Sequence, residues 1–172
     1  MARIAAIIED MYEDEEYDAP AKAFRDEGHE VVNLGLERGK KVRGKRGNSE
    51  TTVEKEVGEA SVDDYDALFI PGGYSPDKLR ASDKPVNFVK EFMDRDKPTF
   101  MICHGAQLLI TAKVLEGRKA TGWKSIVQDI KNAGAEYLDQ EVVKDGNLIS
   151  SRQPSDLPAF IEASRSLLEK KE

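Results

Sequence analysis

The residue best suited to chemistry in this sequence is Cys103, the single cysteine of the chain. It directly follows the apolar run at 99–102, which is typical of a buried strand, and it precedes a helical pattern over 105–114. A cysteine at this joint lies on a tight turn, where the positive end of the helix favours the thiolate, the nucleophilic form. We therefore expect a reactive thiol at a nucleophile elbow. The alternative is a small buried hydrophobic residue.

Several residues near this joint are of types that assist a nucleophile. His104 can act as a base if a carboxylate orients its second ring nitrogen. The turn Pro71-Gly72-Gly73 closes another apolar run, and its glycines allow the backbone to approach a substrate closely. The amides of Gly73 and His104 together suit an oxyanion hole. The acidic stretch at 9–16 offers a carboxylate that holds the sulfur and moves a proton.

The histidine and cysteine counts exclude several other chemistries. Of the two histidines, His29 lies in a turn and none follows His104, whereas papain-like enzymes and amidotransferases need a histidine far downstream of the cysteine. No Cys-x-x-Cys pair is present, and one cysteine with two distant histidines does not make a zinc site. The dinucleotide fingerprint Gly-x-Gly-x-x-Gly is absent. We expect neither a metal nor a cofactor.

Short apolar runs alternate with helical patterns along the chain. The expected strands lie at 4–8, 30–34, 67–70 and 99–102, and the expected helices at 83–93, 105–114, 126–133 and 155–168. Another helix follows the first strand and is capped by Gly28, with Pro20 either in its first turn or inside a longer helix. A hairpin over 142–150 turns at Asp145-Gly146-Asn147. This order predicts an α/β three-layer sandwich with a mainly parallel sheet and a ligand site at one sheet edge.

The segment 36–60 interrupts this alternation, because it is rich in charge and glycine. It has room for a small ribbon with strands at 40–43 and 51–54, joined by residues 44–48. Six of its basic residues lie close together, namely Arg38, Lys40, Lys41, Arg43, Lys45 and Arg46. No aromatic residues are interleaved with them, so we favour a solvated ribbon that protects a sheet edge over a phosphate or nucleic-acid contact.

Composition limits the class of protein further. The chain has 172 residues and a net charge of −7, which predicts one domain over 1–172 and argues against nucleic-acid binding by the chain as a whole. One cysteine cannot form an internal disulfide. No apolar run is long enough to span a membrane or to serve as a signal peptide. We expect a cytoplasmic protein without membrane contact.

The motifs named so far resemble the PfpI branch of the DJ-one/PfpI superfamily. The resemblance runs from the first strand to the last helix. It is carried by the stretches at 67–73, 75–80 and 98–110, and by shorter matches at 115–118, 132–135 and 150–157. Together with the acidic segment Tyr12-Glu13-Asp14, the cysteine elbow and the Gly-Gly turn make a specific combination. The resemblance implies a flavodoxin-like fold.

The resemblance also implies residue roles. Cys103 matches the family nucleophile and His104 the histidine next to it. Glu13 matches the glutamate that hydrogen-bonds the cysteine sulfur. Asp77 matches an acidic residue that reaches the histidine of a neighbouring subunit in oligomeric members, which implies a homo-oligomer, at least a dimer, with Asp77 supplied in trans.

Family members resemble intracellular cysteine peptidases, glyoxalase III-type enzymes and deglycases, and many are linked to stress. Because an amide is a poorer electrophile than an aldehyde and an elbow beside Glu13 is cramped, we expect a cysteine-dependent hydrolase of small aldehydes or glycated amines. We expect no nucleic-acid binding other than as a glycated substrate for repair. An intracellular peptidase is the first alternative, and a peroxide sensor or chaperone using Cys103 is the second.

Overall fold

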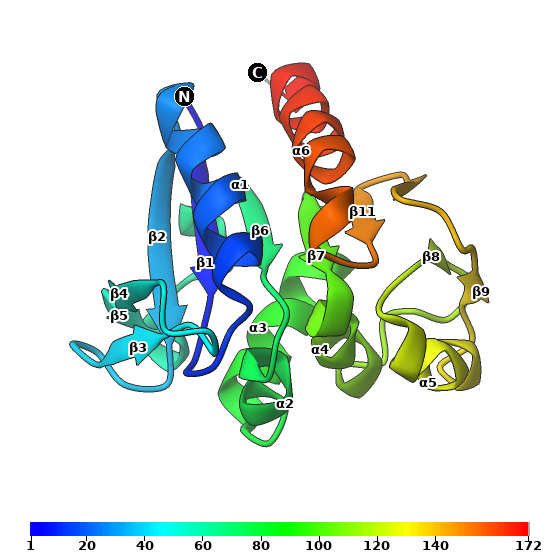
Figure 1. The fold of residues 1–172 in the computed structure, drawn as a ribbon, viewed down its shortest axis with the longest axis horizontal. Coiled ribbons are helices and arrows are strands. Elements are labelled where there is room, and N and C mark those ends of the chain that lie inside the picture. Colours follow the sequence, from blue (N-terminus) through cyan, green and yellow to red (C-terminus); the bar gives the residue numbers. More distant parts are fainter. Residues whose placement is uncertain (172) are drawn as a thin grey trace.

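The computed structural model describes residues 1–171, in which a seven-stranded sheet lies between two layers of helices (Figure 1). The strands of this sheet are, in spatial order, β10 (Val143–Asp145), β11 (Leu148–Ser151), β7 (Thr99–Ile102), β6 (Ala67–Ile70), β1 (Arg3–Ile7), β2 (Glu30–Gly35) and β5 (Lys55–Glu56). Every pairing is parallel except that of β10 with β11. The predicted flavodoxin-like α/β class is confirmed.

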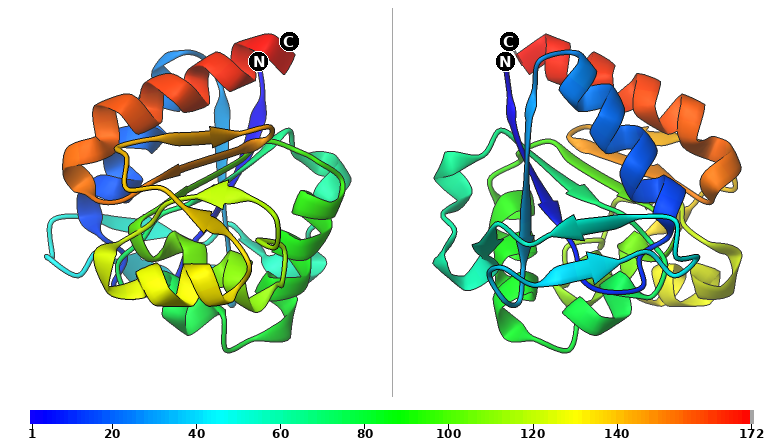
Figure 2. Two further views of the ribbon diagram at one scale, coloured as in Figure 1. Left: turned by 90° about the vertical axis from the view of Figure 1, so that its right-hand side faces the viewer. Right: turned by 60° about the vertical axis from the view of Figure 1, so that its left-hand side comes forward.

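The two helix layers cover opposite faces of the sheet, as Figure 2 shows. One layer holds α1 (Asp14–Asp26) and α6 (Leu157–Lys171). The other holds α2 (Ser75–Leu79), α3 (Asp83–Asp94), α4 (Ala106–Thr111) and α5 (Val127–Asn132). Side chains alternate between the layers along each strand: in β1, Ile4 and Ala6 pack toward α1 and α6, whereas Ala5 and Ile7 face the other layer. Burial on both faces explains why the strands read as continuous apolar runs.

Two small sheets lie outside the main one. The antiparallel ribbon of β3 (Lys41–Arg43) and β4 (Glu50–Thr52) occurs where the sequence predicts a ribbon. A parallel pair, β8 (Lys119–Ala120) and β9 (Glu136–Tyr137), was not predicted. Pro20 is buried inside α1, so the longer of the two predicted helices forms, and Gly28 follows its end with φ +88°.

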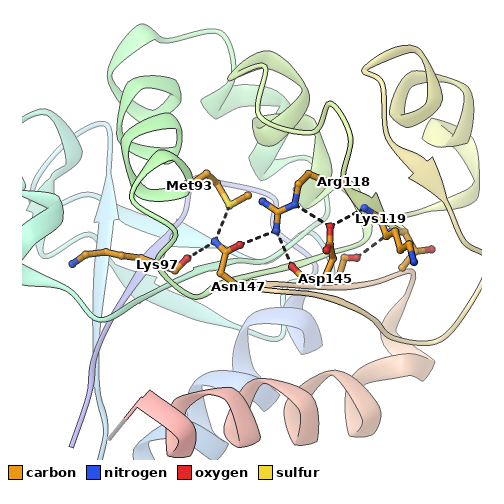
Figure 3. Close-up of polar contacts among 8 residues, drawn as sticks. Met93, Lys97, Arg118, Lys119, Asp145 and Asn147 are labelled. Atoms are coloured by element: carbon orange, nitrogen blue, oxygen red, sulfur yellow. Dashed lines mark hydrogen bonds and ion pairs between the residues drawn. The ribbon is translucent and has the colours of Figure 1, made fainter.

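A cluster of polar side chains ties the β10–β11 hairpin to the rest of the molecule (Figure 3). Arg118 bonds through Nε to Asp145 Oδ2 at 2.9 Å and through Nη2 to Asn147 Oδ1 at 2.7 Å. The buried amide of Asn147 then donates to the backbone oxygen of Lys97 at 2.8 Å, and Lys119 N–H donates to Asp145 at 2.9 Å. We call these residues the Arg118 cluster. Its hydrogen bonds fix the turn predicted at Asp145-Gly146-Asn147.

Across residues 1–171, none of the helices combines the length and the apolar character that crossing a bilayer requires.

Candidate active site

Cys103 lies where β7 ends, on a single 3₁₀ turn (Cys103–Gly105) that leads into α4. Its φ of +60° is in the left-handed region, which a residue with a side chain adopts only under local constraint. Gly105 allows the turn, because a Cβ there would lie 2.8 Å from the backbone oxygen of Ile70. The predicted cysteine elbow is confirmed, and the side chain is buried with 8% exposure.

The glycine turn after β6 comes close to this elbow. Gly73 has φ +77°, and a Cβ on it would lie 2.4 Å from the backbone nitrogen of Glu13. A Cβ on Gly72 would lie 2.8 Å from Cys103 Cβ and 2.4 Å from Glu16 Oε1. The backbone N–H groups of Gly73 and His104 both hydrogen-bond the sulfur. The two amides that the sequence analysis paired as an oxyanion hole therefore converge at the sulfur of Cys103.

The carboxyl group whose charge acts on the sulfur is that of Glu16, whereas the resemblance gave this place to Glu13. Glu16 is fully buried in the first turn of α1, and its Oε1 accepts the N–H of Gly72 at 3.0 Å. Glu13 precedes the helix and binds two cations, Lys45 Nζ at 2.8 Å and Arg46 Nε at 2.5 Å. Because α1 begins at Asp14, its first turn directs Glu16 toward β7.

The pKa values of this pair differ from the sequence-based expectation. Burial, together with the negative charge of Glu13, raises the pKa of Glu16 from 4.5 to about 8. Burial and the charge of Glu16 also raise the pKa of the Cys103 thiol, although the amides of His104 and Gly73 oppose this. The sequence-based expectation of a thiolate considered the helix start alone, whereas the site places two acids next to each other that compete for ionisation.

His104 reaches the sulfur despite being its neighbour in sequence. Its Nδ1 lies 3.4 Å from Cys103 Sγ, and its Nε2 lies 3.4 Å from the hydroxyl of Ser125. Burial and the charge of Lys45 lower the pKa of His104, whereas the charge of Asp77 raises it. Asp77 is exposed on α2, and within residues 1–171 no hydrogen bond joins it to His104. In this chain the group at the second ring nitrogen is thus a hydroxyl.

These groups line a cavity of about 430 Å³ that opens at the carboxyl edge of the sheet. Its wall includes Glu13, Glu16, Gly73, Cys103 and His104 from the predicted set, and also Lys45, Arg46, Tyr74, Trp123, Ser125 and Pro154. Lys45 and Arg46 belong to the ribbon for which the sequence favoured a solvated role, and the sequence contained no functional signal for Tyr74, Trp123, Ser125 and Pro154. Trp123 also fixes the elbow directly, since its N–H donates to the backbone oxygen of Cys103 at 3.2 Å.

Among residues 1–171, no three side chains of His, Cys, Asp or Glu are grouped so that they would hold a metal ion.

The fold and the site together define a class: flavodoxin-like α/β proteins with a cysteine at a strand-to-helix elbow, a buried glutamate beside the sulfur and a glycine turn across from it. The chain belongs to the DJ-1/PfpI family, which it matches over residues 2–166.

Two curated relatives and one solved structure illustrate this membership. General stress protein 18 of Bacillus subtilis is 52% identical over 98% of this chain and 98% of its own length. Protein/nucleic acid deglycase 2 of Escherichia coli is 48% identical, over 96% of this chain and 97% of its own. A two-domain protein from Anabaena variabilis, with DJ-1/ThiJ/PfpI-like and ferritin-like domains, is 43% identical with a TM-score of 0.96 and covers 98% of this chain and 48% of that longer chain.

Proposed function

We propose that this protein is a cysteine-dependent hydrolase that removes glyoxal-type adducts from amines and thiols, or converts the free aldehydes, with Cys103 as its nucleophile. The observation that carries the proposal is the buried pair of Cys103 and Glu16, with the N–H groups of Gly73 and His104 directed at the same sulfur. A proton acceptor next to a thiol, facing two fixed donors, suits attack on a polarised carbon.

The proposed reaction has three steps, which are attack of the thiol on the adduct, isomerisation of the product and hydrolysis. In its ionised form Glu16 accepts the proton of the Cys103 thiol, the sulfur bonds to the carbinol carbon of a methylglyoxal adduct, and the amine leaves with the proton that Glu16 returns. The resulting hemithioacetal isomerises to a thioester as hydrogen moves from the carbinol carbon to the neighbouring carbonyl carbon, with Glu16 or His104 carrying the proton. Water then hydrolyses the thioester to lactate and regenerates the thiol. A free aldehyde enters by adding to the thiol and joins at the second step.

The pKa shifts of Glu16 and His104 fit this scheme. Because the pKa of Glu16 is about 8, its carboxyl group exchanges a proton readily near neutral pH, which a general acid–base group requires. His104 has a lowered pKa and is neutral at the same pH, so it can accept a proton. The similarity to a relative named as a deglycase and to one named as a general stress protein supports this substrate class and a role in stress.

Two other activities of Cys103 are less well supported. A peptidase must admit an extended polypeptide to its nucleophile, whereas Cys103 is 8% exposed at the base of a cavity of about 430 Å³. A peroxide sensor needs a large thiolate fraction, whereas burial and Glu16 raise the pKa of this thiol. The site therefore favours small electrophiles.

Assembly forms a second part of the proposal. Asp77 lies exposed on α2, and in the part of the chain that the structure describes no hydrogen bond joins it to His104 of the same chain. We infer that a homo-oligomer brings Asp77 of a second copy to the histidine. The Asp77→Asn variant should then lose activity while keeping its fold and its mass by light scattering. A fully active monomer would contradict this arrangement.

The experiment that tests the function is a substrate panel with methylglyoxal, its adducts with N-acetyllysine and N-acetylcysteine, and a fluorogenic peptide. Lactate formation is measured for the wild type and for Cys103→Ser. We expect lactate from the adducts with the wild type, little with the variant, and no peptide cleavage. Equal lactate formation by the two proteins would refute the proposal, and cysteine-dependent peptide cleavage alone would replace it with proteolysis.

A further inference from the structure

The loop between β3 and β4 is built to present two cations to the active-site cavity. Buried Asp14 accepts the backbone N–H of Arg46 at 2.9 Å and that of Asn48 at 2.8 Å. The N–H of Lys45 donates to the backbone oxygen of Tyr12 at 2.8 Å. A Cβ on Gly44 would lie 2.2 Å from the Asp14 carboxyl carbon, so the loop and the start of α1 are in contact. The positions of Lys45 and Arg46 are therefore set by the backbone.

These two cations share one carboxylate. Lys45 Nζ binds Glu13 Oε2 and Arg46 Nε binds Glu13 Oε1, and all three side chains line the cavity. Glu13 is thereby fully engaged. Arg46 uses Nε for this contact and its side chain is 59% exposed, so that its other guanidinium nitrogens are accessible to a ligand in the cavity that Arg46 lines. A guanidinium edge of this kind matches the two oxygens of a carboxylate.

The charge of the cavity favours an anion as well. Its lining contains two permanent cations, Lys45 and Arg46, against the single permanent anion Glu13. Glu16 is largely protonated at neutral pH because burial raises its pKa to about 8, and His104 is neutral because its pKa is lowered. The cavity that holds the nucleophile therefore has a net positive charge, although the whole chain carries −7.

We propose that Lys45 and Arg46 form an anion subsite that selects substrates carrying a carboxylate a few bonds from the carbon that Cys103 attacks. The preferred substrates are then adducts of small acids, such as those formed on free amino acids and their thiols, over otherwise identical neutral adducts. The inference deepens the proposed function and rests on it for the identity of the reaction. The selection of a carboxylate by these two residues is a separate property, which can be measured without turnover.

The test uses the fact that Cys103 is the single cysteine of the chain, so that alkylation reports on this site alone. Iodoacetate and iodoacetamide carry the same leaving group and differ in a carboxylate against an amide. Their rate ratio is measured for the native protein and divided by the ratio for the same protein in denaturant. Any change in the pKa of the thiol alters both rates equally and cancels in this ratio.

For the wild type we expect a normalised preference for iodoacetate of about three- to tenfold, the range of a partly exposed charge-assisted contact. It should fall to within about twofold of unity in Lys45→Met and Arg46→Met, and it should shrink as salt rises. The matched control is Arg43→Met on the same ribbon, since Arg43 pairs with Glu50 outside the cavity. This variant loses the same charge and should keep the preference.

A second arm compares kcat/KM for methylglyoxal adducts of N-acetylcysteine and of its amide, with the same variants. If the wild type hydrolyses both adducts but shows no preference in either arm, the subsite is refuted while the proposed function stands. If it hydrolyses neither adduct yet alkylates with the expected preference, the function is refuted and the subsite stands. An equal loss of the preference for iodoacetate in Arg43→Met would also refute the subsite, because the preference would then depend on the overall charge of the protein and not on Lys45 and Arg46.

Discussion

Two polar clusters of this protein, the Arg118 cluster and the one around Cys103, treat their acidic groups in opposite ways. In the Arg118 cluster, Asp145 is surrounded by donors from Arg118 and Lys119, which lower its pKa. In the cysteine cavity, Glu16 is buried with Glu13 and the thiol as acidic neighbours, and its pKa is raised to about 8. The Arg118 cluster stabilises the ionised form of Asp145, whereas the surroundings of Cys103 stabilise the protonated form of Glu16.

The difference separates a structural cluster from a functional one. Asn147 in the Arg118 cluster has its amide nitrogen and oxygen both bonded, as expected where polar groups fix a turn. By contrast, Glu16 Oε2 is buried without a hydrogen-bond partner among the described residues, and Cys103 has a left-handed backbone. Backbone strain and buried ionisable groups of this kind cluster at functional sites.

The largest expected effect is the loss of activity when Glu16, the buried acid beside Cys103, is replaced. Glu16→Gln removes the proposed proton acceptor and should lower kcat/KM for methylglyoxal adducts by about 100-fold or more, the usual contribution of general acid–base catalysis. Its circular dichroism spectrum should be unchanged. The control is Glu15→Gln, because Glu15 is exposed one position earlier on α1. Comparable losses in the two variants would show that α1 as a whole, and not the buried acid, matters.

The next effect concerns stability at different pH values. The folded-state pKa of Glu16 lies above its ordinary 4.5, so folding favours the protonated form. Its contribution is complete below 4.5 and is lost as pH rises through about 8. The Glu16→Gln variant should therefore gain stability relative to the wild type over this interval, by a few kcal/mol. Thermal melts across that range measure the gain, and a difference independent of pH would contradict it.

A third prediction addresses the structural cluster. Asn147→Ala removes the acceptor of Arg118 Nη2 and the amide that donates to the backbone oxygen of Lys97, so that Arg118 keeps its bonds to Asp145 and the Lys97 oxygen keeps the hydroxyl of Thr99. The expected loss is about 1–3 kcal/mol, which lowers Tm by about 2–10 °C while kcat/KM stays unchanged. Asn132→Ala on the exposed side of α5 is the control and should move Tm little. A fall in kcat/KM with Asn147→Ala would show that the Arg118 cluster also affects activity, which would contradict its purely structural role.

The smallest effect tests the opposite sign of pH dependence. Because the pKa of Asp145 is lowered, its ionised form stabilises the fold above its ordinary value of 3.8, and this contribution is lost as pH falls through the folded-state pKa. Asp145→Asn should therefore destabilise by about 1 kcal/mol at neutral pH and by less near about pH 3. Denaturant titrations at the two pH values measure this difference. A larger loss in acid would reverse the assigned sign.

Much of the fold follows from patterns in the sequence, because strands buried on both faces are continuous apolar runs. The runs at 67–70 and 99–102 coincide with β6 and β7, and the position of Cys103 follows from where β7 ends. The two-residue strands β5, β8 and β9 escaped prediction, since so short a segment has no periodicity and forms only when its partner is in place.

The site was predictable only where it adjoins these strands. Cys103, His104 and Gly73 follow apolar runs directly, so topology brings them together. The choice between Glu13 and Glu16 depends on which residue begins α1, and the run Glu13-Asp14-Glu15-Glu16 contains no apolar residue to set the helical face. Lys45 and Arg46 reach the cavity through a loop whose docking depends on buried Asp14, a long-range contact that local composition does not encode.

The backbone carbonyl group of Cys103 contacts residues 122 and 123, which lie about twenty positions further along the chain. Trp123 donates to it, and a side chain added at Gly122 would lie 3.1 Å from the same oxygen and 2.9 Å from Ile130 Cδ1. The geometry of the nucleophile is thus braced by the strap that runs from β8 to α5. Because Trp123 and Ser125 of this strap also line the cavity, substitutions along it will alter both the position of Cys103 and the cavity wall.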